Sequence, residues 1–123
     1  MTLDILYVDD EPDLREIASM ALELDPEITV RTASGGAAAL EILSGWTPDV
    51  ILLDMMMPGM DGPAAHDAIR ALPGGGPPVI YITARTQEAE IAHLLSLGAV
   101  GVIAKPFDPM SLADQVRDLA DRV

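Results

Sequence analysis

The chain has 123 residues, which suits one domain, and half of them are apolar, enough to build a core at this length. Its formal net charge is −13, so its surface should repel phosphate backbones, and direct binding of nucleic acid is not expected. It has no cysteine, no apolar run near the roughly 20 residues that span a bilayer and no recognisable signal peptide, so we expect no disulfide, no membrane insertion and a cytoplasmic location.

Short apolar strands alternate with helices in the first half of the chain. The predicted elements are strands at residues 5–8, 28–32 and 50–53, a helix at residues 12–24 and a helix from Ser34-Gly35 to about Leu43. Pro12 suits the first turn of its helix, where the missing N–H leaves no hydrogen bond unmade. The apolar residues at helical spacing, which should face the core, are Leu14, Ile17, Ala21, Leu24, Leu40 and Leu43.

Turn residues separate the elements of the second half. Pro58-Gly59 and Asp61-Gly62-Pro63 predict turns before a third helix that runs to Leu72, and residues 73–78 predict a loop. The other predicted elements are strands at residues 79–82 and 100–104, a helix at residues 87–97 ended by Gly98, and a last helix after Asp108. The residues expected to face the core are Ala65, Ala68, Ile69, Leu72, Ile91, Leu94, Leu95, Leu112, Val116, Leu119 and Val123.

This alternation predicts an α/β fold made of five successive β-α units. The strands are apolar, apart from the alternating character of residues 28–32, and apolar strands are typical of a parallel sheet with helices on both faces. Right-handed crossovers then favour a doubly wound five-stranded sheet with five helices. We expect one domain over residues 1–123.

Polar residues follow four of the five predicted strands directly. They are Asp9 and Asp10 after the first strand, Asp54 after the third, Thr83 after the fourth and Lys105 after the fifth. Because ligands of open parallel sheets bind outside the carboxyl ends of the strands, we expect these five residues to meet at one edge.

The chemistry of this set favours phosphoryl transfer. Three neighbouring carboxylates repel one another, and Mg²⁺, which prefers oxygen ligands, would relieve the repulsion. An ammonium from Lys105 and a hydroxyl from Thr83 would neutralise the oxygens of a transferring phosphoryl group. A carboxylate can act as the nucleophile and form an acyl phosphate, and Asp54, on the central strand, is the best placed to do so.

The ordered motifs of the chain resemble those of response-regulator receiver domains over essentially its whole length. The matching segments are Asp9-Asp10-Glu11, the ten residues from Leu53 to Gly62 (LDMMMPGMDG), Ile82-Thr83-Ala84 and Ala104-Lys105-Pro106-Phe107. The resemblance implies a flavodoxin-like fold with strand order 2-1-3-4-5 and the role of a two-component switch. Each motif is weak alone, whereas the ordered set is specific.

The same resemblance implies the roles of the metal and phosphoryl ligands. Asp54 matches the phosphoacceptor, Asp10 a direct metal ligand, Asp9 a ligand through water, and Met56 the residue whose backbone carbonyl binds the metal. The implied cofactor is Mg²⁺.

Two further residues match the part of the family's site that responds to phosphorylation. Thr83 matches the switch hydroxyl and Lys105 the phosphate-binding lysine, with a cis Lys105-Pro106 peptide bond. Val102 departs from the family, which often has tyrosine or phenylalanine there, so coupling between the threonine and an aromatic ring is in doubt. Signalling would then rest on shifts around residues 87–97.

The resemblance also implies partners. The family docks on a histidine kinase or a histidine phosphotransfer protein through the first helix and the loop after the fifth strand; the residues that match this surface are Leu14, Ile17, Ala18, Pro106 and Phe107. A downstream protein target is expected as well, and a homodimer could form through the Gln87–Val123 face.

Four interpretations stay open at the level of the sequence. The chain could be a receiver without an output domain, since it ends at Val123 after the fifth helix, or a receiver cut from a longer regulator or hybrid kinase. A phosphohydrolase that uses an aspartyl-phosphate is less favoured, because Met56 stands where such enzymes often have an acid-base carboxylate. A pseudo-receiver that works without phosphorylation is disfavoured by the complete polar set.

The remaining residues that could bear chemistry are interpreted as structural. His66 and His93 fall on predicted helices without ligand spacing, so we expect both at the surface. The adjacent Met55, Met56 and Met57 point in different directions on an extended loop, which indicates packing and not a copper site.

Overall fold

The computed structural model describes residues 1–123, and they form a five-stranded parallel sheet covered by helices on both faces. The strands are β1 (Leu3–Val8), β2 (Ile28–Ala33), β3 (Val50–Asp54), β4 (Val79–Thr83) and β5 (Gly101–Ala104), and the helices are α1 (Pro12–Leu22), α2 (Gly36–Leu43), α3 (Gly62–Arg70), α4 (Glu88–Ser96) and α5 (Leu112–Ala120), with a 3-10 turn η1 at Pro73–Gly75. The strand order is β2-β1-β3-β4-β5. The predicted fold is therefore confirmed.

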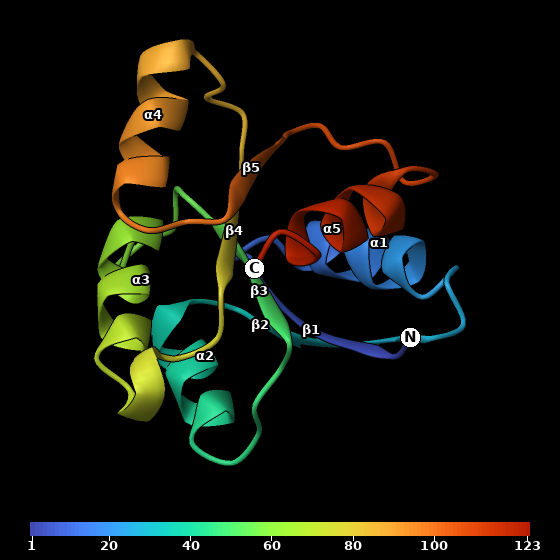
Figure 1. The fold of residues 1–123 in the computed structure, drawn as a ribbon, viewed down its shortest axis with the longest axis horizontal. Coiled ribbons are helices and arrows are strands. Elements are labelled where there is room, and N and C mark those ends of the chain that lie inside the picture. Colours follow the sequence, from blue (N-terminus) through green and yellow to red (C-terminus); the bar gives the residue numbers. More distant parts are fainter.

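The helices divide into two layers. Figure 1 shows α1 and α5 on one side of the sheet and α2, α3 and α4 on the other. The strand order places β3 at the centre of the sheet, where it pairs with β1 on one side and β4 on the other. No helix is long and apolar enough to cross a membrane.

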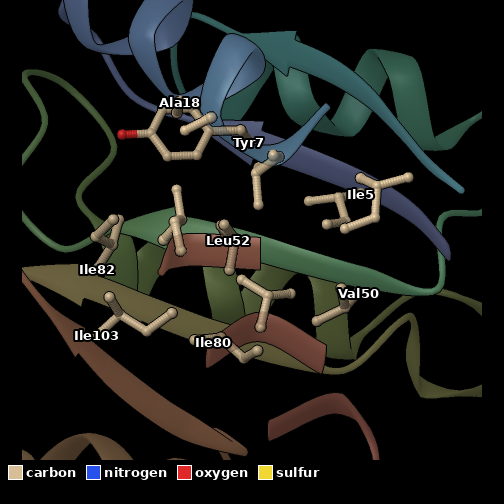
Figure 2. Close-up of a cluster of buried hydrophobic side chains, with 13 residues drawn as sticks. Ile5, Tyr7, Ala18, Val50, Leu52, Ile80, Ile82 and Ile103 are labelled. Atoms are coloured by element: carbon tan, nitrogen blue, oxygen red, sulfur yellow. The ribbon is translucent and has the colours of Figure 1, made fainter. Parts of the chain in front are cut away.

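Two apolar clusters fill the space between the sheet and its helix layers. Alternate residues of the strands enter each cluster because successive side chains of a strand point to opposite faces. Ile5, Tyr7 and Leu52 belong to the cluster under α1 and α5, which Figure 2 shows, and Leu6 and Leu53 belong to the cluster under α2, α3 and α4. Strands β3 and β4 and residues 5–8 of β1 are buried on both faces, as their continuous apolar runs predict, whereas the edge strand β2 exposes Thr29 and Arg31.

Four residues predicted to face the core do not. Ile17 and Leu95 are 44% and 45% exposed, and Leu24 and Val123 are 62% and 75% exposed. Helix α1 ends at Leu22 and α5 at Ala120, so Leu24 and Val123 lie beyond the helical repeat that predicted them inside. Ile17 and Leu95 stand at the edge of their helices' apolar stripes, and α1 and α4 cover the sheet with the neighbouring Ala18 and Leu94.

The prediction of a surface position is also wrong for His66, which is only 4% exposed. Its Nδ1 lies 2.8 Å from the hydroxyl of Tyr81 on β4, and the two rings meet edge to face. Burial lowers the pKa of His66, and the charge of Arg70 lowers it further. The Tyr81 hydroxyl thus provides the hydrogen-bond partner that His66 needs in the protein interior. His93 is exposed, as predicted.

Candidate functional site

The carboxyl ends of the central strands bring three aspartates together. Val8 of β1 pairs with Leu53 of β3, so Asp9 and Asp54 follow at the same level of the sheet. One carboxylate oxygen from each of Asp9, Asp10 and Asp54 lies within 4.8 Å of the others. Asp9 is completely buried and Asp54 is 5% exposed, whereas Asp10 is half-buried. The predicted acidic cluster is therefore present in the structure.

Lys105 joins this cluster from the end of β5. Its Nζ lies 2.9 Å from Asp9 Oδ2 and 3.2 Å from Asp54 Oδ1. Burial acts to lower the pKa of the Lys105 ammonium, but its hydrogen bond to Asp9 and the charge of Asp54 outweigh it and leave the pKa raised. Lys105 is therefore a positive charge placed between two buried carboxylates. The following Lys105-Pro106 peptide bond is cis, as the family resemblance implies.

The electrostatics of Asp54 differ from those of an ordinary surface aspartate. Burial raises the pKa of its carboxyl group, the charge of Lys105 lowers it in part, and the charge of Asp9 raises it again. The net shift is upward. The ionised form of Asp54 is thus less stable here than in water, and an additional cation near it would be favourable.

Asp9 is held by donors on three sides. Its Oδ2 accepts hydrogen bonds from the Tyr7 hydroxyl and from Lys105, both at 2.9 Å, and its Oδ1 accepts one from the Glu11 backbone N–H at 3.0 Å. The Arg15 guanidinium donates to the backbone carbonyl of Asp9 at 2.8 Å. Burial and the nearby Asp9 charge raise the pKa of Tyr7, so its phenol stays protonated and remains a donor.

The role of Tyr7 was not predicted from the sequence. It lies within an apolar strand, and its ring belongs to the core. The available signal was its position two residues before Asp9, because residues two apart on a strand point to the same face.

The hydroxyl of Thr83 lies at the edge of the site and makes no hydrogen bond with the charged side chains there. Its Oγ1 donates to the sulfur of Met55 at 3.7 Å and accepts from the Arg85 backbone N–H at 3.0 Å. The hydroxyl makes no hydrogen bond with Asp54 or Lys105, although the Thr83 backbone carbonyl accepts one from the Lys105 backbone N–H at 2.8 Å. On the neighbouring strand Val102 is half-buried and packs in the cluster under α2, α3 and α4, so no aromatic ring stands at that position.

The loop after β3 is fixed against the site by Gly62. A Cβ on this residue would lie 2.6 Å from the carbonyl oxygen of Asp54 and 2.8 Å from Met55 Cα, so only glycine fits. The Gly62 N–H donates to the Met55 carbonyl at 2.9 Å. The side chain of Met56 is 57% exposed, while Met57 is buried. A turn was predicted here, but this close backbone approach was not.

The donor set fits a hard divalent cation. Three carboxylates face one ammonium, which leaves an excess of negative charge. The oxygens of Asp9 are already engaged by the protein, whereas the Asp10 carboxylate accepts no hydrogen bond and is free to bind an ion. Carboxylate oxygens are ligands that Mg²⁺ prefers. The arrangement also places the carboxylate of Asp54, a chemical group that can act as a nucleophile, beside an ammonium that can meet a second anionic group.

Comparisons with known proteins agree with this geometry. A family model described as the response regulator receiver domain matches residues 5–117. The DNA-binding response regulator MtrA of Mycolicibacterium smegmatis is 35% identical over 92% of the chain and 48% of its own length, and response regulator SaeR of Staphylococcus aureus is 34% identical over 97% of the chain and 51% of its own length.

A solved structure shows the same fold. The chemotaxis response regulator CheY4 of Vibrio cholerae superposes with a TM-score of 0.85 and 29% identity, covering 97% of this chain and 99% of that one. By contrast, the chain spans about half the length of the curated relatives it matches. The similarity therefore concerns one module of those relatives.

Proposed function

The chain belongs to the family of response regulator receiver domains of two-component signalling, and on this premise we propose that Asp54 accepts a phosphoryl group from a phosphohistidine. Residues 1–123 would form a single receiver domain. The observation that carries the proposal is the Lys105 ammonium, held between the buried carboxylates of Asp9 and Asp54 at the carboxyl edge of the sheet.

In the proposed transfer an oxygen of Asp54 attacks phosphorus as the phosphorus–nitrogen bond of the phosphohistidine breaks. Lys105 turns from the carboxylates to an oxygen of the phosphoryl group, since its long side chain can pivot within the site. The Thr83 hydroxyl, now directed to Met55, would turn to another phosphoryl oxygen. The conformational change that follows would serve partner binding or passage of the phosphoryl group to another histidine.

We propose that Mg²⁺ is the cofactor. Asp10, Asp54 and the backbone carbonyl of Met56 would hold it directly and Asp9 through water, and the bound ion would supply positive charge to the phosphoryl oxygens. The support is the excess of negative charge in the cluster and the free carboxylate of Asp10.

The direct test is phosphoryl uptake by the purified chain. With acetyl phosphate and Mg²⁺, intact mass should show one phosphoryl group per chain, and with EDTA in place of Mg²⁺ uptake should fall by about 100-fold or more. Equal uptake under both conditions would contradict the metal requirement. Absence of uptake even with Mg²⁺ present would favour a receiver that works without phosphorylation.

The proposed reaction is limited to the protein's own phosphorylation and dephosphorylation. In this family the residues that flank the water for hydrolysis match Met56 and Arg85, and both are exposed here. Arg85 has no acceptor and the Met56 thioether is only a weak one, so neither side chain is suited to orient or deprotonate the water. We therefore expect Met56→Asn to dephosphorylate faster than the wild type, by several-fold, because an amide can position the water.

The measurement for this prediction is the decay of the phosphorylated protein by intact mass, at saturating Mg²⁺ and after removal of the donor. Met56→Leu is the matched control, since it changes the side chain without adding an acceptor. Equal decay of the asparagine variant and the wild type would show that residue 56 does not control the water.

A groove beside Lys105 supports the proposed docking of a histidine kinase or histidine phosphotransfer protein. It has a volume of about 450 Å³, and its wall includes Leu14 and Ile17 of α1 and Phe107 of the loop after β5. Exposure of Ile17, which was predicted to be inside, adds apolar surface here. An apolar surface next to the nucleophile suits a helix that carries the phosphohistidine.

Leu14→Asp should therefore slow transfer from a phosphorylated histidine kinase or phosphotransfer protein by about tenfold or more, because it places a charge in the apolar contact. Uptake from acetyl phosphate should be unchanged, since that donor needs no docking. Leu95→Asp on α4 is the control, because Leu95 is an exposed leucine, at 45%, that does not line this groove. Normal protein-dependent transfer in Leu14→Asp would rule out this surface.

A further inference from the structure

Tyr7 joins the core of the molecule to the proposed phosphoacceptor site. Its side chain is completely buried, and its ring packs in the cluster under α1 and α5. Figure 2 shows the ring beside Ala18, with the phenol oxygen pointing away from Ile5. That oxygen donates to Asp9 Oδ2 at 2.9 Å. In the buried part of β1, residues 5–8, the Tyr7 hydroxyl oxygen is the one polar side-chain atom, and it is directed at the acidic cluster.

The three donors to the Asp9 carboxylate differ in their freedom to move. The Tyr7 hydroxyl is fixed by a buried ring, and the Glu11 N–H is part of the backbone. Lys105 has a flexible four-carbon chain, is 15% exposed in its side chain, and is shared with Asp54. It is therefore the donor that can leave Asp9 when another anion enters the site.

Movement of the Lys105 ammonium away from Asp9 would cost free energy if no other group donated a hydrogen bond to Asp9 Oδ2, because this carboxylate is completely buried. The Tyr7 hydroxyl occupies the same oxygen and does not depend on Lys105. We propose that Tyr7 is a positioning residue of the phosphoacceptor site, which keeps Asp9 satisfied and oriented so that Lys105 is released to the phosphoryl group. This inference rests on the proposed function of Asp54.

The test is Tyr7→Phe, which removes the hydroxyl and keeps the ring. Without the phenol, Asp9 should hold Lys105 more tightly, so the maximal rate of uptake from acetyl phosphate at saturating Mg²⁺ should fall by about tenfold. The affinity of the metal-free variant for Mg²⁺, measured by calorimetry, should equal or exceed that of the wild type. The reason is that the Asp9 carboxylate has lost a hydrogen-bond donor that partly neutralised its charge. Structural damage to the site would instead weaken Mg²⁺ binding.

Tyr81→Phe is the matched control. Tyr81 is the other tyrosine of the chain, is equally buried, and also has one hydrogen-bond partner, His66 at 2.8 Å, but it belongs to the opposite cluster. Its uptake rate should equal that of the wild type.

Two results with Tyr7→Phe would overturn the inference: unchanged uptake, or a loss of Mg²⁺ affinity that parallels the loss of rate. An equal slowing in Tyr81→Phe would also overturn it, because the effect would then come from any lost buried hydroxyl. These outcomes leave the proposed function intact as long as the wild type takes up the phosphoryl group. Absence of uptake in the wild type would reject both.

Discussion

Asp54→Ala is expected to abolish phosphoryl uptake from acetyl phosphate. Asp54 supplies the nucleophilic oxygen, and the Lys105 ammonium at 3.2 Å is positioned to meet the charge that arrives on it. Asp9 offers no substitute, because its oxygens are engaged by Tyr7, Lys105 and Glu11. Uptake should fall below detection by intact mass, whereas Asp114→Ala, which removes an exposed carboxylate of α5, should behave like the wild type.

The same substitution should leave the fold intact. Burial raises the pKa of the Asp54 carboxyl, so at neutral pH its ionised form costs stability in the metal-free protein. As pH falls from neutral toward the ordinary aspartate value of about 3.9, the folded state takes up the proton before the unfolded state and this cost disappears. Urea unfolding in EDTA should therefore show Asp54→Ala at least as stable as the wild type at neutral pH. If Asp54→Ala were strongly destabilised, or still took up a phosphoryl group, the assignment of Asp54 as the phosphoacceptor would be contradicted.

Lys105→Met is expected to have the largest effect on stability. Lys105 is the only lysine of the chain, and it neutralises two carboxylates that are almost completely buried. Removing one partner of a buried ion pair typically costs about 3–5 kcal/mol because the other charge stays uncompensated. We expect a loss of about 3 kcal/mol, at the lower limit of this range, because Tyr7 and Glu11 still donate to Asp9.

The measurement is the free energy of unfolding by urea, with EDTA and with Mg²⁺. Mg²⁺ should restore more stability to Lys105→Met than to the wild type, because a cation replaces the lost charge, while uptake should slow by about 100-fold. Arg122→Met is the control, since Arg122 pairs with Asp118 at the surface and its loss should change little. If Lys105→Met were as stable as the wild type without metal, the ion pairs would not hold the site together.

Most of the fold and the charged part of the site could be predicted from the sequence. The buried strands are continuous apolar runs, and Asp9, Asp54 and Lys105 follow them directly, so parallel alignment of the strands is enough to bring these residues together. The helical connections make the strands parallel, so that all of their carboxyl ends lie at the same edge of the sheet.

The errors have a common physical origin. Helical spacing defines which residues share a face, but it does not say where a helix ends or how wide the covered stripe is, so Leu24 and Ile17 were placed inside. Buried His66 has a hydrogen-bond partner in the Tyr81 hydroxyl, which comes from a distant part of the chain. Buried Tyr7 donates to Asp9 at the end of its own strand. Such pairings depend on three-dimensional positions that a periodic pattern does not contain.

The central claim is that Asp54 forms the acyl phosphate. Borohydride reduces an aspartyl-phosphate to homoserine, so the wild type treated with acetyl phosphate and Mg²⁺, then reduced and digested, can be mapped by tandem mass spectrometry. We expect homoserine at residue 54 and unmodified aspartate at residues 9 and 10. Homoserine at either of those residues, or at none of the three, would contradict the proposed function.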